Sequence, residues 1–187
     1  MVRSSRRFER TRSNGSADDS LAEPQNEANS ESAARAIVLR RLTASARTRH
    51  ELDEDLTGRG FPADVIECVL DRFEEVGLVN DAEFAESWVA SRHRTRGAAR
   101  SVLRRELRNK GVNDELAESA LASISSEDEL VRARALIDRK LITLRSASRE
   151  HAQRRLVAYL LRRGYQGGVA SAVVSQALDL HDVQIDG

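Results

Sequence analysis

Two groups of arginines are the residues of this 187-residue sequence whose type and spacing favour binding chemistry. They recur at helical spacing with only Glu106 and Glu150 as acids on the same predicted helices. Like charges at this spacing destabilise a helix slightly, so a surface that keeps them more often has a negatively charged partner. The candidate partner-binding residues form two groups. The stronger candidates are Arg92, Arg94, Arg96, Arg100, Arg104, Arg105 and Arg108, and the second group is Arg149, Arg154, Arg155, Arg162 and Arg163.

Catalytic chemistry is not indicated by any other group of residues. The four histidines are scattered without a metal-ligating partner at helical spacing, and the sequence has no glycine-rich phosphate loop. We therefore expect that the protein is not an enzyme and that it has no catalytic residues, no cofactor and no metal site. Its route to an effect would then be binding alone.

The formal net charge of zero conceals blocks of alternating sign. Residues 51–86 carry 12 acids and 2 bases, and residues 87–112 carry 8 bases and 1 acid. Residues 113–130 carry 6 acids and no base, and residues 131–163 carry 10 bases and 2 acids. Such blocks create local potentials that govern association rather than the fold.

The basic surface has two alternative interpretations besides a protein partner. One is an exposed arginine face held in surface ion pairs, without a binding role. The other is DNA binding by a helix-turn-helix, whose second helix should carry Arg, Lys, Asn or Gln toward base edges. The segments that would supply this helix, such as "NDELAESAL", are acidic or apolar, so we do not expect sequence-specific readout. Non-specific contact with the phosphates of single- or double-stranded DNA remains an alternative.

A repeated leucine pattern predicts the helices that carry these arginines. Relative to Gly60, Gly111 and Gly164, which are 51 and 53 residues apart, apolar residues recur at five shared offsets. Leucines stand eight and four residues before each glycine, and apolar residues stand one, five and ten residues after it. Internal repeats of this length indicate stacked helical units. The composition, rich in Ala, Leu, Arg and Glu, also favours helices.

The register predicts an all-α fold of three tandem three-helix repeats that form an elongated, curved array. We place the repeats at residues 33–79, 80–124 and 125–187, with nine helices in total. Residues 1–32 are polar and lack apolar periodicity, so we predict a disordered tail there. The three glycines should adopt left-handed caps at helix ends. Two helix starts have capping-box spacing, Asn80 with Glu83 and Ser126 with Glu129.

On the helix before Gly111, Leu103 and Leu107 should share one side and the arginines the opposite side. Phe84 and Trp88 are predicted core anchors, and Phe61 and Tyr165 should pack beside the cap glycines. Cys68, the single cysteine, is predicted to be a core thiol. One cysteine allows no intramolecular disulfide, and no run of 18 apolar residues occurs. We expect a cytoplasmic protein, without membrane contact, that acts as a monomer.

Three stretches in order resemble the RecX family, which regulates the RecA recombinase. They are the segment from Leu39 to Arg92, "LRRELRNKGVNDELAESAL" and "LVAYLLRRGYQGGVASAVVSQAL". The most specific part is "GLVNDAEFAESWV", in which Asp81, Phe84 and Ala85 follow the glycine at the family's spacing. The third copy departs from the family at Gln166 and Gly168, where a helix cap and an acid are more usual.

The resemblance covers about residues 35 to 180 and implies a non-enzymatic bacterial protein of the cytoplasm. Similar proteins lie in the helical groove of the RecA–DNA filament, and they restrain its growth, its ATP hydrolysis and strand exchange. The resemblance therefore implies the RecA filament as the partner. An elongated shape with alternating charge suits binding to a large, repetitive and charged target.

Overall fold

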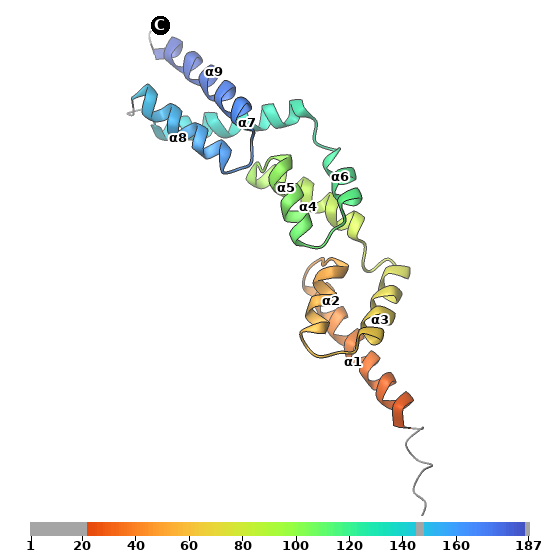
Figure 1. Ribbon diagram of the computed structural model, residues 1–187. Coiled ribbons are helices and arrows are strands. Elements are labelled where there is room, and N and C mark those ends of the chain that lie inside the picture. The colour runs from red at the N-terminus through yellow and green to blue at the C-terminus, as the bar shows by residue number, and fades with distance from the viewer. Residues whose placement is uncertain (1–21, 145–147, 186–187) are drawn as a thin grey trace, which may run out of the picture.

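The computed structural model describes residues 22–144 and 148–185, which contain nine α-helices, one short 3₁₀ helix and no strand. The helices form three successive groups of three along one elongated molecule, with α1 at one end and α9 at the other (Figure 1). The predicted all-α array of three repeats is therefore confirmed.

Each repeat contains three α-helices, and repeat 3 also contains the 3₁₀ helix η1. Repeat 1 consists of α1 (Ala22–Ala44), α2 (Arg49–Thr57) and α3 (Ala63–Glu75). Repeat 2 consists of α4 (Asp81–Arg96), α5 (Arg100–Asn109) and α6 (Asp114–Leu121). Repeat 3 consists of α7 (Ser126–Leu141), η1 (Ile142–Leu144), α8 (Arg149–Leu161) and α9 (Gly167–Ile185).

Helix α1 begins at Ala22, so the prediction of a disordered tail extending to residue 32 is wrong for residues 22–32. This segment contains alanine, glutamate and glutamine, which favour helix, and Pro24 stands in the first turn, where proline is tolerated. Residues 1–21 of the predicted tail lie outside the described residues.

Side-chain caps stabilise the starts of α2, α4, α6, α7 and α8, and the cap of α7 differs from the prediction. Asn80 caps α4 as predicted, since its Oδ1 accepts from the backbone N–H of Glu83 at 3.1 Å. The predicted box of Ser126 with Glu129 is wrong, because the box is formed one residue earlier by Ser125 and Asp128. Buried Ile124, which belongs to the core of repeat 2, holds the chain in this register.

The three repeat glycines end their helices in the left-handed conformation, as predicted. The φ angles of Gly60, Gly111 and Gly164 are 82°, 74° and 86°. A residue with a side chain is disfavoured at such angles because its Cβ crowds the backbone. In each repeat the glycine therefore turns the chain from the second helix into the third.

Each repeat has its own hydrophobic core, and the leucines of the shared register lie at its centre. Leu52 and Leu56, Leu103 and Leu107, and Leu156 and Leu160 are all buried. Phe84 and Trp88 stack with 5.6 Å between their ring centres, which confirms them as core anchors of repeat 2.

Cys68 is exposed, so the prediction of a core thiol is wrong. The buried stripe of α3 centres on Ile66, Val69 and Phe73, and Cys68 falls outside it. Its Sγ lies 3.7 Å from Oε1 of Glu31 on α1.

Repeats 1 and 2 meet at a junction made mainly of polar contacts. Thr48, which is fully buried, donates its Oγ1–H to the carbonyl of Lys110 at 2.6 Å. The backbone N–H of Arg49 donates to Oδ1 of Asp81 at 2.9 Å. The Lys110 ammonium also forms an ion pair with Glu51 at 2.6 Å. Polar groups near the start of α2 thus hold repeat 2 against repeat 1.

Repeats 2 and 3 meet through equivalent positions of the repeat. The backbone N–H of Ala99, twelve residues before Gly111 as Thr48 is before Gly60, donates to the carbonyl of Arg163 at 2.9 Å. The backbone N–H of Arg100 donates to Oε1 of Glu129 at 2.7 Å, as that of Arg49 does to Asp81. The two junctions therefore have donors at equivalent positions, although the acid is the first residue of α4 in one and the fourth residue of α7 in the other.

The second junction adds apolar contact. Ala99 belongs to the hydrophobic core of repeat 3, and the buried Tyr165 donates its hydroxyl to the Gly97 carbonyl at 3.2 Å. Burial raises the pKa of Tyr165 to about 12, so the hydroxyl keeps its proton for this bond. Among the described residues, the cores of repeats 1 and 2 each contain side chains of one repeat only.

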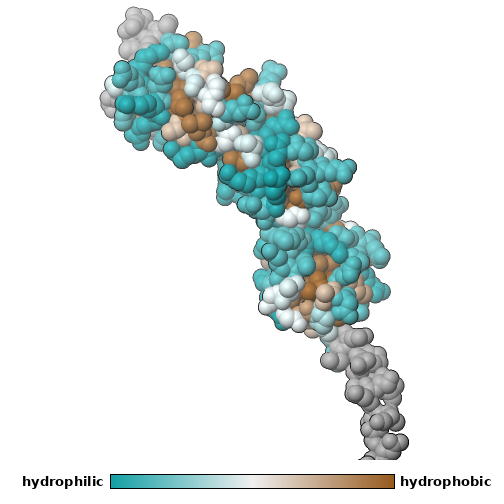
Figure 2. Space-filling model, in the orientation of Figure 1, coloured by the Kyte–Doolittle hydropathy of each residue, from teal (hydrophilic) through white to brown (hydrophobic). Residues whose placement is uncertain are grey.

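The visible surface is mostly hydrophilic, and its hydrophobic areas are small and separate (Figure 2). Within the described residues, no helix combines the length and apolar character needed to cross a bilayer.

Candidate partner-binding surface

Helix α5 separates its core face from its basic face, as the sequence predicts. Leu103 and Leu107 are buried, whereas Arg105 and Arg108 are exposed and Arg104 is half-buried. The core of repeat 2 therefore positions these arginines toward solvent without taking part in the contacts that they make.

The basic face of α5 is largely neutralised by acids of α6. Arg104 forms a bidentate ion pair with Glu118, with 2.8 Å between Nη2 and Oε2. This guanidinium holds the pKa of Glu118 below its ordinary value. Arg108 pairs with Asp114 at 3.0 Å. Acids are scarce on α5 itself, as the sequence shows, but the next helix in the repeat supplies the partners of Arg104 and Arg108.

The remaining basic groups of repeat 2 differ in their surroundings. The Arg92 guanidinium lies 4.0 Å from the ring centre of Trp88, and Arg100 donates from Nη1 to the carbonyl of Ile124 at 3.3 Å. Arg94, Arg96 and Arg105 are exposed, and their side chains have no partner within the part of the chain that the structure describes. Arg92 and Arg100 therefore also support the fold.

The end of α4 is bound by two arginines of repeat 3. The Arg94 carbonyl accepts from Arg132, and the Arg96 carbonyl accepts from Nε of Arg163 at 3.1 Å. Arg163 also lies over the ring of Tyr159, with 3.9 Å from its guanidinium carbon to the ring centre. Of the predicted site residues, Arg163 therefore serves the junction between repeats.

Helix α8 and its C-cap residue Arg162 present a basic surface that is less neutralised than that of α5. Arg154, Arg155 and Arg162 are exposed and line an open depression together with His151 and Ala158. Their guanidinium groups have no side-chain partner among residues 28–144 and 148–180, whose side chains are described. Arg149, at the start of the same helix, is paired with Asp179 of α9.

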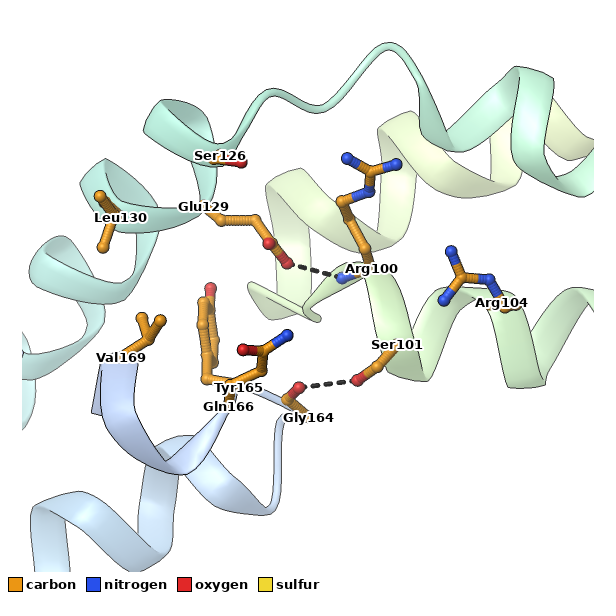
Figure 3. Close-up of a pocket in the computed structure, with 10 residues that line it drawn as sticks. All are labelled: Arg100, Ser101, Arg104, Ser126, Glu129, Leu130, Gly164, Tyr165, Gln166 and Val169. Atoms are coloured by element: carbon orange, nitrogen blue, oxygen red, sulfur yellow. Dashed lines mark hydrogen bonds between the residues drawn. The ribbon is translucent and has the colours of Figure 1, made fainter. Parts of the chain in front are cut away.

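A cleft of about 400 Å³ lies between repeats 2 and 3 (Figure 3). Helix α5 lines one side with Arg100, Ser101 and Arg104, and the starts of α7 and α9 line the other. Ser101 donates its hydroxyl to the Gly164 carbonyl at 2.6 Å. The Glu129 carboxylate that binds the backbone of Arg100 also faces this cleft, so its lining is of mixed charge.

Two basic residues whose side chains join different repeats, Lys110 and Arg132, were absent from the predicted site. Lys110 connects Glu51 to the aromatic pair of repeat 2, with its ammonium 4.5 Å from the ring centre of Trp88. Arg132 reaches from α7 to the end of α4. The Lys110–Glu51 and Arg132–Arg94 contacts each join two repeats. The spacing of residues within one helix does not reveal such contacts. Within the described residues, no group of three or more His, Cys, Asp or Glu side chains is arranged to hold a metal ion.

Comparison with known proteins identifies relatives along most of the chain. Models of the three three-helix domains of RecX match residues 34–73, 80–121 and 127–174 in that order. The regulatory protein RecX of Streptomyces coelicolor is 50% identical over 146 residues, which cover 78% of this chain and 78% of the relative. The regulatory protein RecX of Thermobifida fusca is 46% identical over 153 residues, covering 82% and 83%.

Solved structures show the same fold at lower identity. The crystal structure of RecX from Lactobacillus salivarius superposes with a TM-score of 0.72 and 24% identity, covering 82% of this chain and 99% of that one. A second crystal structure of a regulatory protein RecX gives a TM-score of 0.74 at 20% identity, covering 84% and 79%. All three repeats are matched in sequence and order, and the chain belongs to the RecX family of regulatory proteins.

Proposed function

We propose that this chain is a non-enzymatic regulator that binds the RecA recombinase filament and inhibits its ATP hydrolysis and strand exchange, thereby regulating DNA repair and recombination. Membership of a family of regulatory proteins named RecX supports the regulatory role. The identity of the partner is our inference from that family and from the surface.

The observation that carries the proposal is the repeated junction. Because residues at equivalent positions donate hydrogen bonds across both junctions, the three units follow one another in a similar way. A regular array can present similar surfaces at regular intervals to a target that is itself a polymer of identical subunits. The alternation of acidic and basic blocks gives such a contact a defined register.

Inhibition by binding requires a difference in affinity between two states of the filament. A ligand that binds the active and inactive arrangements equally tightly shifts neither of them. We therefore propose that the array spans neighbouring recombinase subunits and binds best to the spacing that they adopt in the inactive arrangement.

A pull-down of RecA by this chain tests the proposal. RecA is offered alone, with single-stranded DNA, and with single-stranded DNA and a slowly hydrolysed ATP analogue. Capture should be strongest in the third mixture, in which the filament forms. Immobilised DNA without RecA is the control for direct DNA binding. Equal capture of RecA in all three mixtures would argue against a filament-specific contact.

Non-specific DNA binding is the second candidate function, because the exposed arginines of α8 carry a charge that phosphates can also bind. Guanidinium groups bind phosphates, and such binding weakens steeply as salt concentration rises. The acidic helix α6, which follows Gly111, makes base readout in a major groove unfavourable.

A further inference from the structure

We propose that the exposed face of α8, rather than that of α5, makes the main contact with the partner, and that the partner presents carboxylates on a protein surface. The inference rests on the proposed function and assigns its contact face. The α8 face consists of His151, Arg154, Arg155, Ala158 and Leu161 of α8 together with Arg162, the residue that follows the helix.

The α8 face is continuous and lies opposite the core. At 100° per residue, His151, Arg154, Arg155, Ala158 and Arg162 fall within an arc of about 100°, with Leu161 at its edge. The same rotation places the buried residues of α8, Ala152, Leu156 and Leu160, on the other side. Substitution of the exposed arginines should therefore leave the core of repeat 3 unchanged.

Within the part of the chain that the structure describes, the arginines of this face are not paired with acids, whereas two arginines of α5, Arg104 and Arg108, are. Arg104 and Arg108 are compensated by Glu118 and Asp114. The three α8 arginines have no acid paired with them among the described residues. Glu150 lies four residues before Arg154 near the edge of the face, but it is not paired with Arg154 among the described residues, and Asp179 of the neighbouring α9 is paired with Arg149. Like charges on one helix face repel one another, and an acidic partner would relieve this cost.

The face combines charge with apolar area, which favours a protein partner over a phosphate backbone. Leu161 is 48% exposed at the edge of the arc, and Ala158 lies between the arginines. Arginine is enriched at protein interfaces, and lysine is depleted there. Helix α8 contains no lysine. Tyr159, its one aromatic residue, is covered by Arg163 and so is not available to stack on a nucleic-acid base.

Two charge-matched variants of the full chain test the assignment. Arg154→Gln/Arg155→Gln/Arg162→Gln removes three positive charges from α8, and Arg104→Gln/Arg105→Gln/Arg108→Gln removes three from α5. Circular dichroism melting confirms that each variant folds. Affinity is measured for the RecA filament, for poly-glutamate as a carboxylate probe, and for a single-stranded oligonucleotide as a phosphate probe.

The α8 variant should lose at least about tenfold in affinity for the filament and for poly-glutamate, and the α5 variant less than about threefold. An equal or larger loss in the α5 variant would overturn the assignment of the face. If the α8 variant loses oligonucleotide binding but keeps poly-glutamate and filament binding, the partner is nucleic acid and the proposal is wrong. Failure of the wild type to bind the filament, with poly-glutamate binding that depends on α8, would reject the proposed function but keep the contact face.

Discussion

Gly111 lies directly against the side chain of His50, so that a Cβ at Gly111 would approach the imidazole closer than 3.0 Å. The glycine belongs to repeat 2 and the histidine to repeat 1. Gly164 has the same relation to Ser101 and Val102 of repeat 2. A Cβ at Gly60, in contrast, would have no neighbour within 4 Å. The three glycines share one backbone conformation, but two of them also allow the repeats to approach closely.

Alanine substitutions at the three glycines should therefore have unequal effects. Gly60→Ala should lower the free energy of unfolding by about 1 kcal/mol, because alanine is strained in the left-handed conformation of Gly60. Gly111→Ala and Gly164→Ala should cost more, because the new methyl group also overlaps the preceding repeat. Urea unfolding followed by circular dichroism measures all three.

The double variant His50→Ala/Gly111→Ala provides the control. Removal of the imidazole should reduce the cost of Gly111→Ala toward that of Gly60→Ala, which gives a measurable coupling energy. Equal costs at Gly60, Gly111 and Gly164, with no coupling to His50, would contradict the close approach of the repeats.

Thr48→Val should weaken the junction between repeats 1 and 2. The substitution keeps the shape of the side chain but removes its hydroxyl. That hydroxyl donates to the Lys110 carbonyl, and it caps α2 by accepting from the backbone N–H of Glu51. The loss of a buried hydrogen bond should cost roughly 1–3 kcal/mol. Trp88, the only tryptophan, lies beside Lys110, so its fluorescence reports on this junction.

Thr43→Val is the matched control for this variant. Thr43 is exposed and donates to the Leu39 carbonyl within its own helix. Its substitution should leave both stability and Trp88 emission close to those of the wild type. A Thr48 variant as stable as the Thr43 variant would show that the Thr48 hydroxyl contributes little to the junction.

Acid should selectively remove the stabilisation that involves Asp55. Hydrogen bonds from Arg41, at 2.8 and 2.9 Å, hold the pKa of Asp55 well below its ordinary value of 3.8. A depressed pKa in the folded state means that the contribution is complete above about pH 4 and disappears as pH falls through the folded-state pKa. Asp55→Asn should therefore be less stable than the wild type at pH 7.

Thermal unfolding of both proteins at pH 7, 4 and 2 checks this dependence. The difference in Tm between the wild type and Asp55→Asn should become smaller toward pH 2. A difference that stays constant over this range would mean that the Arg41 contact does not stabilise the ionised form.

Cys68 should react with a thiol reagent in the native protein because its side chain is exposed on α3. The reaction should reach one thiol per chain without denaturant, at a rate similar to that in denaturant. Cys68→Ser should change stability by less than about 0.5 kcal/mol, as surface substitutions usually do. Slow labelling that requires unfolding would restore the core assignment that the sequence suggested.

The sequence predicts the repeats well because core position and helix capping depend on local spacing. The leucines around the three glycines define a helix face, and burial of that face produces three similar cores. Left-handed caps follow from the glycines themselves. The prediction for Ser126 is wrong by one residue along the chain, and that for Cys68 by less than one turn of the helix. Local sequence patterns do not specify positions this finely.

The basic surface is harder to predict because its neutralisation depends on the angle between helices. Glu118 lies 14 residues after Arg104, and only the fold of α6 against α5 brings the two together. The sequence therefore favoured the α5 arginines, whereas the structure shows that those of α8 are less compensated. The contacts of Lys110 and Arg132 likewise require the arrangement of successive repeats.

The most direct test of a filament regulator compares inhibition of RecA ATPase with binding to naked DNA over one salt series. Binding that depends on phosphates of single-stranded DNA should weaken with a log–log slope of about −0.7 per phosphate contacted. Assays of this chain without RecA control for ATP hydrolysis by the chain itself. We predict that inhibition persists at salt concentrations where the chain no longer binds single-stranded DNA. If inhibition and DNA binding disappear together, competition for the strand explains the inhibition, and a specific contact with the RecA filament is contradicted.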